Sequence, residues 1–155
     1  MDTVYLGELV RAPDHRVRAA AMRVVSQWIE DFRLGTGVAI PSSDESSLRR
    51  YLQAGVVDSH PRVRLEATRG WARLKKPESA AEALKVLDQP MDRFLDFALW
   101  QTMRDLKEAW LPAVISGEIS IDQQIPHWVF ALRAVEAREA IPILMKVIQN
   151  RPQEH

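Results

Sequence analysis

One short motif occurs twice in the sequence, 46 residues apart, and it constrains the fold more than any other feature. The segments 15–23 and 61–69 share Arg, Val, Arg, Ala and Arg at corresponding positions. A repeat of about 40–47 residues is typical of proteins built from stacked helix pairs. In such proteins each pair buries its apolar side against its neighbours, so the motif predicts a row of packed helices.

The residues around both copies are those of helix N-termini. Asp14 precedes the first copy, and Asp58, Ser59 and Pro61 accompany the second. Asp and Ser side chains accept hydrogen bonds from the free amides of a first helical turn, and Pro fits there because its φ is already helical. Inside both copies apolar residues recur three or four positions apart, which predicts amphipathic helices.

The same patterns continue along the chain and predict an all-α protein of nine helices. Ser120 is expected to cap the eighth helix, in which Pro126 marks either a kink or the true start. Gly55 is expected to end its helix in the left-handed conformation, and the last helix is expected to tolerate Pro142 only in its first turn. The expected ranges are 3–11, 15–32, 42–54, 61–74, 76–87, 92–106, 109–116, 120–136 and 137–150.

The turn at residues 58–61, followed by Val63, Arg64 and Ala67, resembles the signature of the HEAT-repeat family. The resemblance implies a right-handed α-α superhelix, a solenoid of about four HEAT-like helix pairs in a single domain spanning residues 1–155. The implied repeats are 3–32, 42–76, 78–106 and 107–136, followed by a final helix at 138–150. The repeat-signature residues with an implied structural role are Val17, Arg18, Asp58, Pro61, Val63, Arg64 and Ala67.

The HEAT pattern also implies contacts between repeats. Val17 and Val63 are expected to point inward, and Arg18 is expected to contact Asp58, as an exposed pair worth about 0.2–1 kcal/mol. An offset of 31 residues places Phe94 at the position of Val63 in the third repeat. The large side chains expected between the helix layers are Trp28, Trp71, Phe94 and Trp100.

A narrower resemblance involves residues 58–67, 91–102 and 110–112. These segments look like the HEAT segment of large exported bacterial dehydrogenase/cytochrome c chains of the planctomycete type. In that family a sugar-dehydrogenase-like β-propeller precedes the HEAT region and a c-type cytochrome domain follows it. The resemblance implies a spacer within a multidomain, exported chain, whereas a freestanding domain is expected to be cytoplasmic.

Composition and residue spacing argue against chemistry within these residues. The sequence has no Cys, which excludes disulfides, thiolate metal sites and cysteine nucleophiles. His15 and His60 are expected in turns about 10 Å apart, one helix spacing, and His127 is expected to be a packed side chain. Asp92 and Asp96 share a helix face but have no facing partner. We therefore expect a non-enzymatic chain with no catalytic residues, no metal and no cofactor, and no membrane insertion because no apolar run approaches about 20 residues.

Basic side chains gather on the helix faces opposite the apolar stripes. This candidate interaction face consists of Arg16, Arg23, Arg62, Arg69, Arg73, Arg93 and Trp100. It is either the solvated surface of a scaffold for protein–protein or inter-domain contacts, or the binding site of a freestanding module for an acidic protein or a nucleic acid. Residues 1–76 carry 13 basic and 9 acidic side chains, and residues 77–155 carry 8 and 12. The excess of four basic side chains in residues 1–76 is small for a nucleic-acid-binding domain, so the scaffold is favoured. Its partner and oligomeric state stay open.

Overall fold

The computed structural model describes residues 3–36, 42–122 and 124–149, and within these ranges it contains nine α-helices, one 3-10 helix and no strand. The all-α prediction is therefore confirmed. No helix in the described part of the chain is both long enough and apolar enough to cross a membrane. The elements in chain order are α1 (Thr3–Leu9), α2 (His15–Leu34), α3 (Ser42–Val56), α4 (Pro61–Leu74), α5 (Glu78–Leu84), η1 (Lys85–Asp88), α6 (Arg93–Asp105), α7 (Lys107–Ser116), α8 (Ile125–Leu132) and α9 (Ala137–Gln149).

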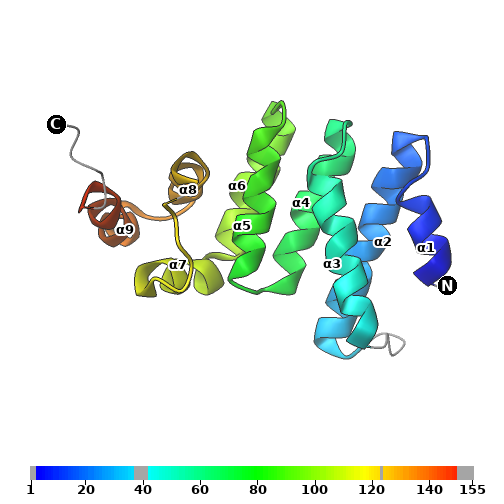
Figure 1. Ribbon diagram of the computed structural model, residues 1–155, viewed down its shortest axis with the longest axis horizontal. Helices are drawn as coiled ribbons and strands as arrows, with labels where there is room; N and C mark the ends of the chain where they lie inside the picture. The colour runs from blue at the N-terminus through cyan, green and yellow to red at the C-terminus, as the bar shows by residue number, and fades with distance from the viewer. Residues whose placement is uncertain (1–2, 37–41, 123, 150–155) are drawn as a thin grey trace.

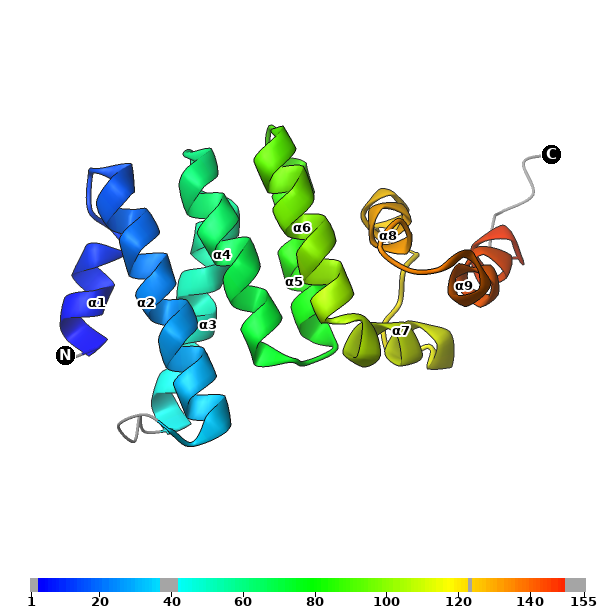
Figure 2. The same ribbon diagram turned by 180° about the vertical axis from the view of Figure 1, so that it is seen from behind.

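The first six helices form a row of three antiparallel pairs, with α1 beside α2, α3 beside α4, and α5 beside α6 (Figure 1). The helices α2, α4 and α6 lie side by side in one layer, which faces the viewer in Figure 2. The helix α4 packs against α2 on one side and α6 on the other. After α6 the row changes direction. The helix α7 extends sideways from the lower end of α6, and α8 and α9 are seen nearly end-on (Figures 1 and 2).

The hydrophobic core lies between these helices, and its close packing determines the role of Gly55. Trp71 of α4 and Trp110 of α7 are fully buried, as the sequence predicted for Trp71. Gly55 does not end its helix but lies within α3. A Cβ atom at Gly55 would lie 2.6 Å from the Cβ of Ala67 and 2.8 Å from the Sδ of Met22. The predicted stop at Gly55 is therefore wrong, because this glycine permits a close helix contact rather than a left-handed turn.

Two predicted helix positions near the C-terminus are also wrong. The helix expected from Ser120 begins at Ile125, with Pro126 in its first turn, and the hydroxyl of Ser120 instead accepts from the amide of Asp122 in the preceding turn. Pro126 therefore marks the true start of α8. Pro142 lies inside α9 rather than in its first turn, because α9 begins at Ala137. Residue 123, the last of the predicted capping box, lies outside the described residues.

The helix caps set the alignment of the third helix pair with the second. Asp14, His60 and Asp92 are the N-caps of α2, α4 and α6, so the corresponding positions of α4 and α6 are 32 residues apart, not 31. The residue that corresponds to the buried Val63 is therefore Leu95, which is fully buried, while Phe94 is 60% exposed. The prediction that Phe94 fills the space between layers is wrong by one position, which on a helix turns the side chain outward.

Val17, near the N-terminal end of the row of helices, is a second residue that was predicted to point inward and is exposed. Val17 is 36% exposed, whereas Val63 at the corresponding position is buried. The inward position predicted for Val17 is therefore wrong, since α2 has only the seven-residue α1 beyond it and α4 has a full helix on each side. Trp28 and Trp100 are only partly buried and pack at the margin of the core.

The predicted contact between Arg18 and Asp58 is confirmed, and it is more buried than expected. The Nε and Nη2 atoms of Arg18 donate to the two carboxylate oxygens of Asp58 at 2.8 and 2.9 Å, and each side chain is only 14% exposed. Burial opposes ionisation of Asp58, but hydrogen bonds from Arg18 and from the His60 amide outweigh it and lower the pKa of this carboxyl. Arg64 is buried and donates to the carbonyls of Asp58, Ser59 and Pro90, so it links turns without a carboxylate.

Candidate interaction surfaces

The first row of the predicted arginine face lies near the N-termini of α2, α4 and α6. Arg16 and Arg62 are each two residues after a helix cap, both are exposed, and among the described interactions neither has an ion pair. The corresponding residue of α6 is Phe94, and Arg93 lies one position before it. The guanidinium carbon of Arg93 lies 4.6 Å from the centre of the Phe94 ring. The row therefore ends in a stacked arginine and an exposed aromatic ring.

The second row is largely neutralised by glutamates that the sequence analysis did not include. Arg23 of α2 donates to Oε1 of Glu66 at 2.7 Å, and Nη1 of Arg69 lies 4.0 Å from Oε2 of the same carboxylate. The hydrogen bond from Arg23 to Glu66 raises the pKa of the arginine. The corresponding position of α6 is Gln101 rather than Trp100, again because the offset is 32 residues. Glu66 precedes Arg69 by three residues, and this helix spacing was the sequence signal for the pair.

Arg73 is compensated in the same way. Its Nη1 atom lies 3.7 Å from Oε2 of Glu30, and Arg33 donates to the other oxygen of Glu30 at 2.6 Å. The hydrogen bond from Arg33, supported by both positive charges, lowers the pKa of Glu30 against the opposing effect of burial. A cavity of about 190 Å³ lies over Arg23, Glu66, Arg69 and Arg73, and a second of about 460 Å³ continues it toward α6. Together these residues make a shallow groove of alternating charge.

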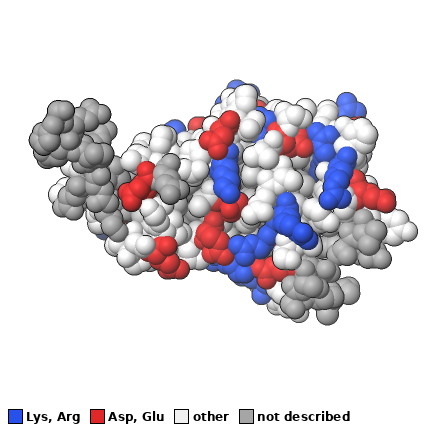
Figure 3. All heavy atoms as spheres, viewed as in Figure 1, with Lys and Arg blue, Asp and Glu red and all other residues white. Residues whose placement is uncertain are grey.

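Basic and acidic side chains are also mixed on the opposite face. Figure 3 shows this face, with most of the visible Lys and Arg over α1–α6 and acidic groups interspersed among them. Lys76, which belongs to the basic first half of the chain, is paired with Glu45 at 2.6 Å. The difference in charge between the two halves of the sequence is thus visible on the surface, but neighbouring carboxylates reduce it locally.

The C-terminal half exposes aromatic and apolar side chains instead. Phe97 of α6 is 62% exposed and stacks on Trp100, with ring centres 5.9 Å apart. The indole nitrogen of Trp100 donates to the carbonyl of Arg133 at the end of α8, at 3.2 Å. The guanidinium of Arg104 lies over the Trp100 ring at 4.9 Å. Trp100 is therefore a surface residue that joins α6 to α8, not a filler between the main layers.

The histidines in the turns are closer together than predicted. The rings of His15 and His60 stack with centres 3.6 Å apart, so the expected separation of about 10 Å is wrong. The side chains at the starts of α2 and α4 meet because these helices run side by side. His60 also caps α4, since its Nδ1 accepts a hydrogen bond from the amide of Arg62 at 3.2 Å. Desolvation and the nearby His15 lower the pKa of His60.

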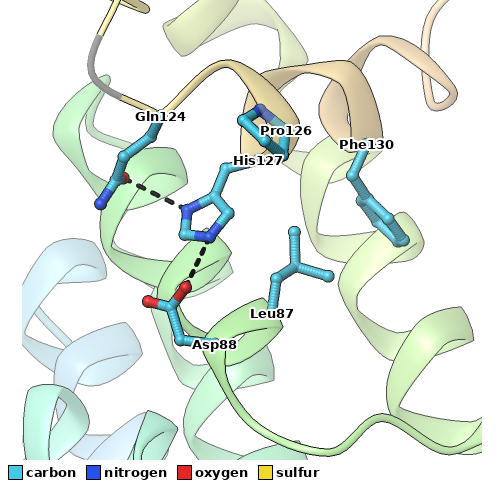
Figure 4. A pocket seen from close by; sticks show the side chains of 6 residues that line it. All are labelled: Leu87, Asp88, Gln124, Pro126, His127 and Phe130. Carbon is cyan, nitrogen blue, oxygen red and sulfur yellow. Dashed lines mark hydrogen bonds and ion pairs between the residues drawn. The ribbon is translucent and has the colours of Figure 1, made fainter.

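His127 is buried, as predicted, and it contacts polar partners that the sequence analysis did not identify. Figure 4 shows its ring between Asp88 and Gln124, at the edge of a cavity of about 590 Å³. Nε2 of His127 lies 2.8 Å from Oδ1 of Asp88, and Nδ1 lies 3.2 Å from Oε1 of Gln124. Both ring nitrogens of His127 therefore have a polar partner within hydrogen-bonding distance.

The remaining acidic candidates have structural roles. Asp92 caps α6 by accepting from the amides of Phe94 and Leu95, and Asp96 lies 3.7 Å from Arg133. They therefore do not form a facing carboxylate pair. Among the described residues, no group of three or more potential ligands is arranged to hold a metal ion.

Comparisons with known proteins found no similar protein. No family model matches the chain, and neither curated proteins nor solved structures gave a match.

Proposed function

We propose that this chain is a non-catalytic HEAT-type scaffold, a right-handed solenoid of about four helix pairs that holds other polypeptides, either neighbouring domains of one chain or separate proteins. The assignment is supported by the row of helix pairs and by the link between Arg18 and Asp58 in successive repeats. Each repeat in such a row contacts only its neighbours, so a large area is left for binding.

The observation that carries the proposal is the exposed apolar stripe of α9. Ile141, Leu144, Met145 and Ile148 lie at the spacing of one helix face, and they are 44–65% exposed. Ala140 and Ile143 on the other side of α9 are buried. The helix thus has one apolar side packed on this chain and a second left open. An exposed apolar surface with this periodicity is typical of a contact with another polypeptide.

Site-specific photo-cross-linking in the cell of origin tests this proposal. Leu144 is replaced by the photo-cross-linker p-benzoylphenylalanine, and the exposed Gln53 of α3 is replaced in the same way as a control. We expect a discrete cross-linked protein from Leu144 that is lost when Ile141→Ser and Ile148→Ser are added. Equal products at both positions, or no product at Leu144, contradict the proposal.

The second candidate is a freestanding module whose arginine face binds an acidic protein or a nucleic acid. Arg16 and Arg62 favour it, because they are exposed and have no ion pair among the described residues. Glu66 and Glu30 count against it, because they already neutralise the arginines of the second row. A salt titration of single-stranded DNA binding distinguishes the scaffold from the binding module, since phosphate binding weakens steeply as salt rises. An affinity that falls steeply with salt favours the arginine face, and no detectable binding contradicts it.

The narrower proposal concerns a longer parent chain. If the resemblance to exported dehydrogenase/cytochrome c chains is correct, the scaffold spaces an electron-donor domain from an acceptor domain. Reading the gene on both sides of this segment tests it: a propeller-like region upstream and a Cys-x-x-Cys-His motif downstream are expected. An open reading frame without either one contradicts it.

A further inference from the structure

A second surface runs along α6, where Arg93, Phe97 and Arg104 are exposed and Trp100 is partly buried. Arg93, Phe97, Trp100 and Arg104 occur at intervals of four, three and four residues, so they lie on one side of the helix. We call these four residues the arginine–aromatic stripe. Eleven residues at about 1.5 Å each separate its two arginines by roughly 16 Å along the helix. The stripe therefore has positive charge at both ends and aromatic rings in the middle.

Aromatic rings hold the arginines of this stripe in place. The guanidinium of Arg93 lies over the exposed ring of Phe94 and that of Arg104 lies over Trp100, at 4.6 and 4.9 Å. Stacking fixes the plane of a guanidinium and leaves the N–H groups at its edge free to bind a carboxylate through two hydrogen bonds. The cost of ordering these side chains is thus partly met before a partner binds.

The carboxylates near the stripe are occupied elsewhere. Asp92 caps α6, Asp96 lies beside Arg133, and Asp105 accepts from Gln101. Among the described interactions neither Arg93 nor Arg104 has an ion pair. This distinguishes the stripe from the groove over α2 and α4, where Glu66 and Glu30 supply the negative charge.

We propose that the arginine–aromatic stripe binds an acidic peptide segment of a partner protein, an inference that rests on the proposed scaffold function. Its carboxylates pair with Arg93 and Arg104, and apolar side chains between them cover Phe97 and Trp100. In an extended peptide, 16 Å corresponds to about five residues at roughly 3.3 Å each. Because alternate side chains of an extended chain point to opposite faces, the preferred ligand has acidic residues about four or six positions apart with apolar residues between them.

The charges favour a peptide over a nucleic acid. A phosphate backbone is bound by many basic groups along its path, and its affinity depends on their number. This stripe offers two arginines without carboxylate partners, and Asp92, Asp96 and Asp105 lie on the same helix. Closely placed acids would repel a continuous backbone, whereas a peptide can place its two carboxylates at the arginines alone.

Fluorescence anisotropy with the full chain tests the proposal. The probe is a fluorescein-labelled extended peptide with glutamates flanking a centre of Leu and Phe. One comparison peptide has Lys in place of Glu, and an oligothymidylate of similar length tests nucleic-acid binding. The variant Arg93→Glu/Arg104→Glu reverses the stripe, and Arg11→Glu/Arg50→Glu is a matched control with the same change in net charge on exposed arginines outside the candidate interaction face. Circular dichroism verifies that both variants keep their helical content.

We expect the acidic peptide to bind the unaltered chain at least tenfold more tightly than it binds the stripe variant. The control variant is expected to stay within about threefold, because Arg11 and Arg50 lie outside α6. Phe97→Ser, at an exposed position, is expected to weaken binding as well.

Equal weakening in both charge variants, equal binding of the Lys peptide, tighter binding of oligothymidylate, or no binding of the acidic peptide would overturn the proposal. Failure here is distinguishable from failure of the scaffold function, since Leu144 cross-linking examines α9 and does not involve α6.

Discussion

Replacing Asp58 by Ala tests how the first two helix pairs are held together. The carboxylate accepts two hydrogen bonds from Arg18 and one from the amide of His60, all at 2.8–2.9 Å. In Asp58→Ala the guanidinium, only 14% exposed, loses its charged partner. Hydrogen bonds to charged groups contribute about 1.5–3 kcal/mol each, but their effects overlap. Exposed pairs contribute only about 0.2–1 kcal/mol.

The burial of this pair places the expected cost above the range for exposed pairs. We expect Asp58→Ala to lower the free energy of unfolding by about 3 kcal/mol, near the lower end measured for breaking a buried pair. With a urea dependence of about 2 kcal/mol per molar, the midpoint falls by roughly 1.5 M. Glu118→Ala is the control, because it removes the same charge from an exposed turn. A difference of less than about 0.5 kcal/mol between the two variants would refute the reasoning.

The pH dependence gives an independent check on Asp58. Its pKa is lower in the folded protein than in the unfolded chain, where it is about 3.9. The stabilisation is therefore fully present above that unfolded value and is lost as the pH falls through the lower folded pKa. In urea titrations, the stability difference between the unaltered chain and Asp58→Asn is expected to be constant near neutrality and to shrink below about pH 4.

Three further perturbations test other features. Trp71→Ala is expected to cost about 3–5 kcal/mol, measured by urea unfolding, because the indole is fully buried. Gly55→Ala would gain about 1 kcal/mol from helix propensity alone. It is nevertheless expected to lower the thermal midpoint, since the new Cβ would lie 2.6 Å from Ala67 Cβ. For His60, a lowered pKa means that its stabilising effect is present above about pH 6.5 and lost as the pH falls through the folded value. Protonation of His60 also removes the Nδ1 acceptor of the cap and repels His15. We therefore expect His60→Asn to reduce the loss of thermal stability between pH 7.5 and 5. An unchanged loss in this variant contradicts the prediction.

The arginine face was predictable as a set of positions but not as an electrostatic surface. Helix periodicity put Arg23 and Arg69 on the polar sides of their helices, and the repeat put them in the same row. The pairing of Arg69 with Glu66 could have been predicted from the sequence, because the two residues lie three positions apart on one helix. The contact from Arg23 spans 43 positions along the chain, and it exists only because α2 and α4 pack side by side.

The third helix pair shows how strongly a core prediction depends on the alignment offset. An offset of 31 residues made Phe94 a core residue, and the true offset of 32 gives that place to Leu95. Successive helix positions are about 100° apart, so an error of one residue exchanges a buried position for an exposed one. The exposed rings of Phe94 and Phe97, and hence the arginine–aromatic stripe, could not be recognised until the Asp92 cap fixed the helix start.

The resemblance to HEAT repeats implied that Arg18 contacts Asp58, 40 positions away. The sequence by itself determined that the chain is all-helical and where most helices begin and end. These features depend on local periodicity, caps and one repeated motif, which are encoded within a few residues of each other. The tertiary structure alone decided the role of Gly55, the stacking of His15 on His60, and which side of α9 stays open. Each of these depends on how closely one helix approaches another, and that distance is set by packing among side chains far apart in the sequence.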